Sequence, residues 1–167
     1  PAEVRWVVLS HLHTDHVGGV DTCPDAEVLV TRDEWLRAQG LAGRVRGYLP
    51  RHWPRQIEPR LLDLDSDPVG PFSGSFDVAG DGTLLVVPLP GHTPGHAGLL
   101  VHDRYRTVLL AGDAAHRADE LAEALPEIAA WCARESVVVA TAHDDDAAVL
   151  LAARAGPPAA DPERALR

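Results

Sequence analysis

The sequence has no methionine, only two cysteines and fewer basic than acidic residues. Without methionine, Pro1 is not an initiation site, so we expect a fragment or a processed chain. Cys23 and Cys132 are too few for a disulfide framework or a thiolate zinc site, and we expect two buried, reduced thiols. The 15 Lys and Arg against 25 Asp and Glu give a net charge of -10, which argues against a surface for nucleic acid or an anionic membrane.

Long apolar runs are also absent. No stretch approaches the roughly 20 residues that cross a bilayer, and no signal peptide precedes the first apolar segment, so we expect a cytoplasmic protein. The 167 residues, 46% of them hydrophobic, suffice for one globular domain. We place this domain at residues 1–156, without its N-terminal strands, and expect a disordered tail at 157–167.

The densest chemical feature is residues 10–19, which read Ser-His-Leu-His-Thr-Asp-His-Val-Gly-Gly. Four of them can bind a metal: His11, His13, Asp15 and His16. A buried strand is predicted before them, over residues 4–10. Because side chains two apart share a face in extended backbone, the first three are expected to converge, and the fourth to join them once the backbone turns. Gly18 and Gly19 are expected to provide the freedom for that turn.

Local patterns predict a mixed α/β (α+β) chain. Further strands are expected over residues 27–31, 75–79, 83–89, 97–102, 107–110 and 137–141. A capping box at Thr31–Glu34 opens a helix that ends near Gly40, and helical patterns recur over residues 117–134, with a break at Pro126, and over 147–155. Residues 41–71 carry little periodicity and are expected to form a long irregular insertion.

Four of these predicted strands each end in a residue that can bind a metal. These strand ends carry His11 with its neighbours, His92 or His96, Asp113, and His143. Strand ends at one edge of a sheet can gather distant residues into one site. Imidazole and carboxylate donors without thiolate suit zinc, and also manganese, iron or cobalt, and the donors are too many for one tetrahedral ion. Two ions are therefore expected, with Asp113 between them because it stands alone at its strand end.

These motifs resemble the metallo-β-lactamase superfamily. The resemblance rests on residues 10–19, on Gly91-His92-Thr93-Pro94-Gly95-His96, on Gly112-Asp113 and on the last strand before His143. With residues 30–35 behind it, the first motif most resembles the N-acyl homoserine lactonase branch. The resemblance implies an αββα sandwich of two sheets, here apparently lacking the N-terminal strands of the first half.

The resemblance also implies a set of ligands and a reaction. One divalent ion is held by His11, His13 and His92, the other by Asp15, His16 and His143, and Asp113 bridges them. A metal-bridging hydroxide then attacks the carbonyl of a lactone or another ester-like bond. Asp15 can also guide a proton to the leaving group.

Four further histidines match the family's ligand pattern less directly or not at all. His116 stands where the lactonase branch has a tyrosine that contacts substrate, and it is a second catalytic candidate. His96 is expected to support a ligand from behind the metal. His52 and His102 match no motif position and are expected on the surface or in a hairpin.

Three alternatives to a lactonase remain open. One is a hydroxyacylglutathione thioesterase, with the glutathione carboxylates gripped by Arg44, Arg46, Arg51 and Arg55. Another is an iron-dependent oxidoreductase of the same fold, and the third is a truncated, inactive remnant that only binds metal. The expected partners are a small-molecule substrate and either a second copy of the chain or a missing N-terminal segment, with no nucleic acid and no membrane.

Overall fold

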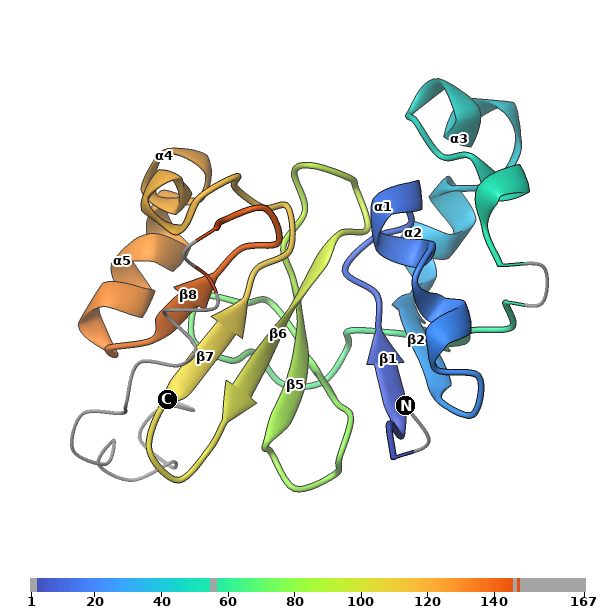
Figure 1. The fold of residues 1–167 in the computed structure, drawn as a ribbon. Coiled ribbons are helices and arrows are strands. Elements are labelled where there is room, and N and C mark those ends of the chain that lie inside the picture. Colours follow the sequence, from blue (N-terminus) through green and yellow to red (C-terminus); the bar gives the residue numbers. More distant parts are fainter. Residues whose placement is uncertain (1–2, 55–56, 146, 148–167) are drawn as a thin grey trace. The chain divides into compact units, whose positions relative to one another are not determined.

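A computed structural model describes residues 3–54, 57–145 and 147 of the chain (Figure 1). The chain forms two compact units, residues 1–63 with 90–97 and residues 64–89 with 98–167, and each has its own sheet. The helix predicted over 147–155, beyond its first residue, and the tail predicted at 157–167 lie outside the described residues. A single domain over 1–156 stays a prediction.

The first unit contains a parallel three-stranded sheet in the order β1-β2-β3. Its strands are β1 (Trp6–Val8), β2 (Glu27–Thr31) and β3 (Arg60–Leu62). The predicted bounds of β2 are confirmed, whereas β1 is shorter than the predicted 4–10. The reason is that its register with β2 ends at Val8 opposite Leu29, and one last bond, from the Leu9 N–H to the Leu29 carbonyl (2.9 Å), follows before the chain leaves the sheet.

Short helices lie between the strands of this sheet along the chain. They are α1 (Thr14–Val17), η1 (Val20–Thr22), α2 (Arg32–Arg37), α3 (Gly40–Val45) and η2 (Pro50–His52). The long irregular insertion predicted over 41–71 is therefore wrong in part, because most of α3, η2 and β3 lie within it. Each of these elements has six residues or fewer, too few for a periodic pattern to stand out.

The core of the first unit packs the loop after β1 against β2 and the segment after α3. Its buried apolar side chains are Leu9, Leu12, Val17, Val20, Val30, Ala38, Tyr48 and Trp53. Trp35 packs against this core, and its ring lies 5.8 Å from that of Trp53. Because Leu12 is fully buried between His11 and His13, packing fixes the backbone that carries these two histidines.

The second unit contains a five-stranded sheet in the order β4-β5-β6-β7-β8. Its strands are β4 (Phe76–Asp77), β5 (Leu84–Pro88), β6 (Ala97–His102), β7 (Thr107–Leu110) and β8 (Val138–Ala140). The two predicted hairpins are confirmed, since β4 pairs antiparallel with β5 and β6 with β7. The last strand, β8, is parallel to β7, and this places the residues that follow both strands at the same edge.

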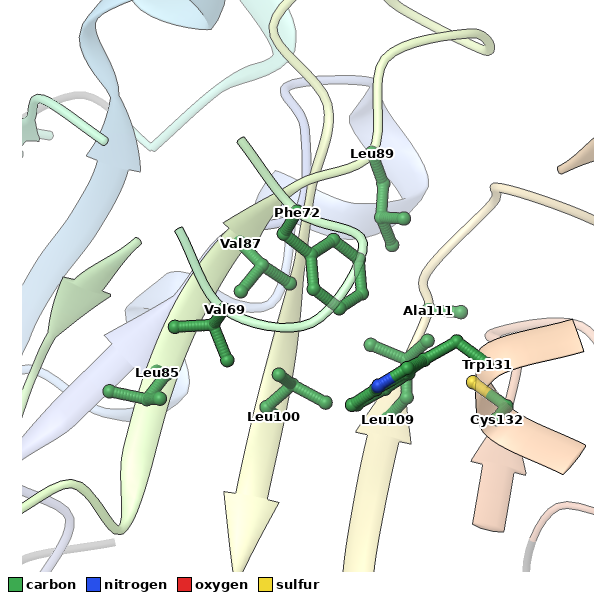
Figure 2. Close-up of a cluster of buried hydrophobic side chains, with 10 residues drawn as sticks. All are labelled: Val69, Phe72, Leu85, Val87, Leu89, Leu100, Leu109, Ala111, Trp131 and Cys132. Carbon is green, nitrogen blue, oxygen red and sulfur yellow. The ribbon is translucent and has the colours of Figure 1, made fainter. Parts of the chain in front are cut away.

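Helices η3 (Ala118–Glu120), α4 (Leu121–Ala124) and α5 (Pro126–Arg134) connect β7 to β8 (Figure 1). The predicted helical break is confirmed, because Pro126 begins α5. Figure 2 shows Trp131 of α5 beside Leu109 and Leu100 of the sheet. The Phe72 ring meets the Trp131 ring edge to face at 5.7 Å, and this cluster forms the core of the second unit.

The two cysteines differ in burial. Cys132 is buried in this second core as expected, whereas Cys23 is only partly buried, so the expectation of two buried thiols is wrong for Cys23. Among the described residues, no helix has the length and apolar character needed to pass through a bilayer.

Candidate metal centre

The loop after β1 carries the histidine-rich motif. His11 and His13 lie in irregular backbone after the strand, and α1 begins at Thr14 with His13 as its N-cap residue. The expectation that Asp15 shares an extended face with them is wrong, because Asp15 lies in the first turn of a helix. The turn also needs no left-handed glycine, since Gly18 and Gly19 have φ of −63° and −85°.

Three imidazole nitrogens of the first unit converge on one point. His13 Nδ1 lies 3.1 Å from His11 Nε2 and 3.0 Å from His92 Nε2, and all three nitrogens are within 4.8 Å of one another. A tetrahedral zinc ion with Zn–N bonds of about 2.05 Å separates two ligand nitrogens by roughly 3.3 Å. The three nitrogens therefore have the spacing of a metal-binding triad with little rearrangement.

For His13 and His11, hydrogen bonds behind the ring indicate which imidazole nitrogen faces this point. His13 Nε2 lies 3.1 Å from the Arg46 carbonyl oxygen. A carbonyl only accepts, so Nε2 carries the proton and the lone pair of Nδ1 faces the other two rings. His11 Nδ1 lies 3.1 Å from the Ser10 hydroxyl, which leaves Nε2 directed at the triad. Such outer partners orient metal-ligating histidines in known sites.

The charge state of His11 also suits metal binding. Burial, together with weaker repulsion from His16, His96, His13 and His92, lowers the pKa of His11 to about 2. The ring is therefore neutral at pH 7, as a ligand must be. The three histidines fit a divalent ion in donor type and spacing.

The remaining predicted site residues of the first unit lie close to this triad. The His16 ring centroid is 4.1 Å from that of His11, and His16 Nε2 is 3.7 Å from Asp15 Oδ2. His96 is buried with its ring centroid 5.3 Å from that of His11, behind the triad. Asp15 has an exposed carboxylate.

In the second unit, Asp113 and His143 meet at one sheet edge. Leu110 of β7 pairs with Ala140 of β8, and each predicted ligand follows its strand by three residues. Gly112, at φ 53°, turns the chain just before Asp113. As a result, His143 Nε2 lies 3.4 Å from Asp113 Oδ2.

His116, the second catalytic candidate, lies beside this pair. Its exposed ring has its centroid 6.0 Å from that of His143. Its backbone carbonyl accepts a hydrogen bond of 3.0 Å from the Thr141 hydroxyl. The loop after β7 and the loop after β8 are therefore tied together at His116.

His52 and His102, which match no motif position, lie on the surface and in a hairpin, as expected. His52 is exposed at the end of η2, where its ring accepts a bond of 3.3 Å from Arg51. His102 ends β6, its Nδ1 lies 2.9 Å from the Thr107 hydroxyl of the hairpin, and burial lowers its pKa.

Sequence reasoning missed the buried side chains that hold these loops. Glu34 is fully buried and accepts hydrogen bonds from the Leu12 N–H (3.0 Å) and the Thr93 hydroxyl (2.7 Å). The predicted capping box is half confirmed: the Thr31 hydroxyl accepts from the Glu34 N–H (3.2 Å), while the Glu34 carboxylate binds these two distant loops. The capping pattern was the sequence signal at Glu34, and it gave the wrong partner for the side chain.

A second buried carboxylate has a matching position in the second unit. Asp144 directly follows His143, and its Oδ2 accepts a hydrogen bond of 3.1 Å from the Ala118 N–H. Its Oδ1 lies 3.7 Å from the Arg117 guanidinium. Nothing in the local sequence distinguishes Asp144 from its exposed neighbour Asp145.

Comparison with known families gives the class of protein. The sequence profile of the metallo-beta-lactamase superfamily matches residues 1–160. The chain therefore belongs to the metallo-β-lactamase superfamily, and its two-sheet mixed α/β structure agrees with that fold. The resemblance inferred from the motifs is confirmed.

The similar proteins include an N-acyl homoserine lactonase and a probable metallo-hydrolase. The N-acyl homoserine lactonase AttM of Rhizobium radiobacter is 34% identical, over 88% of this chain and 60% of that protein. The probable metallo-hydrolase Mb2322c of Mycobacterium bovis is 38% identical, over 68% of this chain and 37% of that protein. The chain thus spans less than two thirds of the length of either protein.

Solved structures support the fold. A variant of AiiA from B. thuringiensis with N-decanoyl-L-homoserine bound at its active site matches 90% of this chain and 59% of that chain, with a TM-score of 0.64 at 20% identity. An N-acyl homoserine lactone hydrolase with N-hexanoyl-L-homoserine at its catalytic metal centre matches with the same TM-score and identity.

Proposed function

We propose that this chain is the metal-binding part of a metallohydrolase that opens ester-like bonds, with an N-acyl homoserine lactone as the favoured substrate. The observation that carries the proposal is the convergence of three imidazole nitrogens, from His11, His13 and His92, with the spacing of a metal-binding triad. The relatives named as lactonases support the choice of substrate. A cytoplasmic location and a small-molecule partner belong to the same proposal.

The proposed centre holds two divalent ions, with zinc favoured and iron, manganese or cobalt as alternatives. The motif resemblance assigns one ion to the triad, the other to Asp15, His16 and His143, and the bridging position to Asp113. Contacts within each unit support parts of this set, namely the triad in the first unit and the Asp113–His143 pair in the second.

Ions held there would supply acidified water and a polarised carbonyl. The chain's own residues would then position the substrate and move protons. Asp15, whose carboxylate is exposed at the first turn of α1, can accept a proton at Oδ2 and return it to the leaving alkoxide. His116 can donate a ring N–H to the substrate carbonyl, since its ring is exposed beside His143.

The test combines metal content with hydrolysis rates. Purified protein is analysed for zinc, iron, manganese and cobalt, and is then assayed on N-hexanoyl homoserine lactone, a lactoyl-glutathione thioester and a simple aryl ester. We expect bound divalent metal and fastest turnover of the lactone. His11→Ala and Asp113→Asn should lose both metal and activity, whereas His52→Ala, an exposed histidine at the end of η2, should keep both.

Other results would favour the alternatives. Preference for the thioester would indicate a hydroxyacylglutathione hydrolase and direct attention to Arg44, Arg46 and Arg51, which are exposed; Arg55 lies outside the described residues. Retained iron with oxygen consumption on a persulfide would indicate the oxidoreductase. Bound metal without any turnover would indicate the remnant, and absence of metal from the wild-type protein would refute the proposed centre.

A further inference from the structure

The carboxylate of Glu34 joins two loops that are far apart in the sequence. Glu34 lies in the first turn of α2, is fully buried, and does not belong to the proposed ligand set. Its Oε1 accepts from the Leu12 N–H at 3.0 Å, and its Oε2 accepts from the Thr93 hydroxyl at 2.7 Å. Each carboxylate oxygen therefore holds a different loop.

Both donors are adjacent to proposed metal ligands. Leu12 stands between His11 and His13, and Thr93 directly follows His92. One buried side chain thus fixes the backbone on both sides of the imidazole triad. A small rotation of either loop would move a ring nitrogen away from the 3.0–3.1 Å spacing of the triad.

The second loop is also packed closely against the backbone at Glu34. A Cβ added at Gly95 would lie 2.1 Å from the Glu34 backbone nitrogen and 2.4 Å from its Cα, so only glycine fits there. The Thr31 hydroxyl, which caps α2, donates to the Gly95 carbonyl at 2.6 Å. The loop that carries His92 therefore packs directly against the first turn of α2.

We propose that Glu34 is a positioning residue that holds the three imidazoles in a metal-ready arrangement before any ion binds. This inference rests on the proposed metal centre. Ligands that are already oriented lose little conformational freedom when an ion arrives, so the affinity for the ion is higher. Loss of the Glu34 carboxylate should weaken metal binding although it touches no ligand atom.

Two substitutions test the hydrogen bonds that the Glu34 carboxylate makes to the two loops. Glu34→Ala removes both acceptors. Glu34→Gln keeps the shape, because the amide oxygen can accept from the Leu12 N–H while the amide NH₂ donates to the Thr93 hydroxyl oxygen. The matched control is Asp33→Ala, which removes an exposed carboxylate from the same helix turn together with its ion pair to Arg37.

The measurements are zinc affinity by competition with a chromophoric chelator, and the visible absorption of the Co²⁺-substituted protein. Glu34→Ala should bind zinc about 10- to 100-fold more weakly, as is typical when the outer partners of ligands are lost. Its Co²⁺ bands should also change in position or intensity. Glu34→Gln should recover most of the affinity and the wild-type spectrum, and Asp33→Ala should match wild type in both.

Each outcome decides between positioning and mere structural support. A Glu34→Ala protein with a lower melting temperature but wild-type zinc affinity and Co²⁺ spectrum would overturn the inference. So would a Glu34→Gln protein as impaired as Glu34→Ala. Wild-type protein that binds neither ion would instead refute the proposed metal centre.

The loops keep one link that does not involve Glu34, because the Ala97 N–H donates to the Ser10 carbonyl at 2.9 Å. We therefore expect Glu34→Ala to fold. If it does not, Thr93→Val removes one of the two donors in a protein with nearly the same side-chain shape. Zinc binding weakened severalfold in Thr93→Val would support positioning, and unchanged binding would overturn it.

Discussion

Replacing Thr31 with valine tests how strongly α2 supports the loop that carries His92. The buried Thr31 hydroxyl makes two bonds, accepting from the Glu34 N–H at 3.2 Å and donating to the Gly95 carbonyl at 2.6 Å. Valine has almost the same shape, so it removes both bonds and leaves no large cavity. The expected effect therefore comes from hydrogen bonding alone.

The loss of free energy of unfolding in Thr31→Val can be estimated from the two hydrogen bonds that it removes. Loss of an N-cap hydroxyl costs about 1 kcal/mol of the free energy of unfolding. A buried carbonyl left without its donor costs about 1–3 kcal/mol more. The sum, about 2–4 kcal/mol, lowers the melting temperature of a chain of this size by about 5–15 °C.

Urea unfolding and calorimetry of the metal-free protein measure this change. Thr31→Ser keeps the hydroxyl and loses one methyl group, so it should cost only about 1 kcal/mol. Thr22→Val is the matched control, because its hydroxyl also donates to a backbone carbonyl, that of Gly19 at 2.7 Å, but in exposed surroundings. A Thr31→Val protein within about 0.5 kcal/mol of wild type, no different from this control, would refute the reasoning.

Acid should destabilise the metal-free protein: burial, with repulsion from the neighbouring histidines, lowers the pKa of His11 from 6.5 to about 2, so below pH 6.5 the unfolded chain binds an extra proton. The free energy of unfolding then falls by at most about 1.4 kcal/mol per pH unit, and equal stability in urea at pH 7 and pH 5 would contradict this. Iodoacetamide at pH 8 should label the partly buried Cys23 and spare Cys132, whose pKa burial raises to about 11, and mass spectrometry showing equal labelling would argue against it. Asp144→Ala should cost about 1–3 kcal/mol in urea unfolding because it removes the buried acceptor of the partly buried Ala118 N–H, whereas Asp145→Ala at the exposed neighbour should cost no more than about 0.5 kcal/mol.

Much of the secondary structure could be predicted because its signals are local. The strands β2, β6 and β7 have their predicted bounds, since each is an apolar run bounded by turn residues. The elements within 41–71 were missed because α3 has six residues and β3 only three. Elements this short owe their structure to packing and strand pairing, which a local pattern does not record.

The candidate site also has a part that the sequence predicted and a part that it did not. The donors at the strand ends could be found because a histidine or aspartate after a buried strand is visible in the sequence. The helical position of Asp15 could not, since α1 begins one residue before it and spans only four residues. Glu34 was interpreted as a capping residue because its true partners, Leu12 and Thr93, are 22 and 59 positions away.

The sequence by itself determined the chemistry of the donors, imidazole and carboxylate without thiolate, and the superfamily to which the chain belongs. Only the tertiary structure decided which atom of each side chain is available. His13 presents Nδ1 because the Arg46 carbonyl, 33 positions away, accepts a hydrogen bond from the Nε2–H. The Glu34 carboxylate is buried away from water, so it needs donors from the protein, and the fold supplies them from the two triad loops as the Leu12 N–H and the Thr93 hydroxyl.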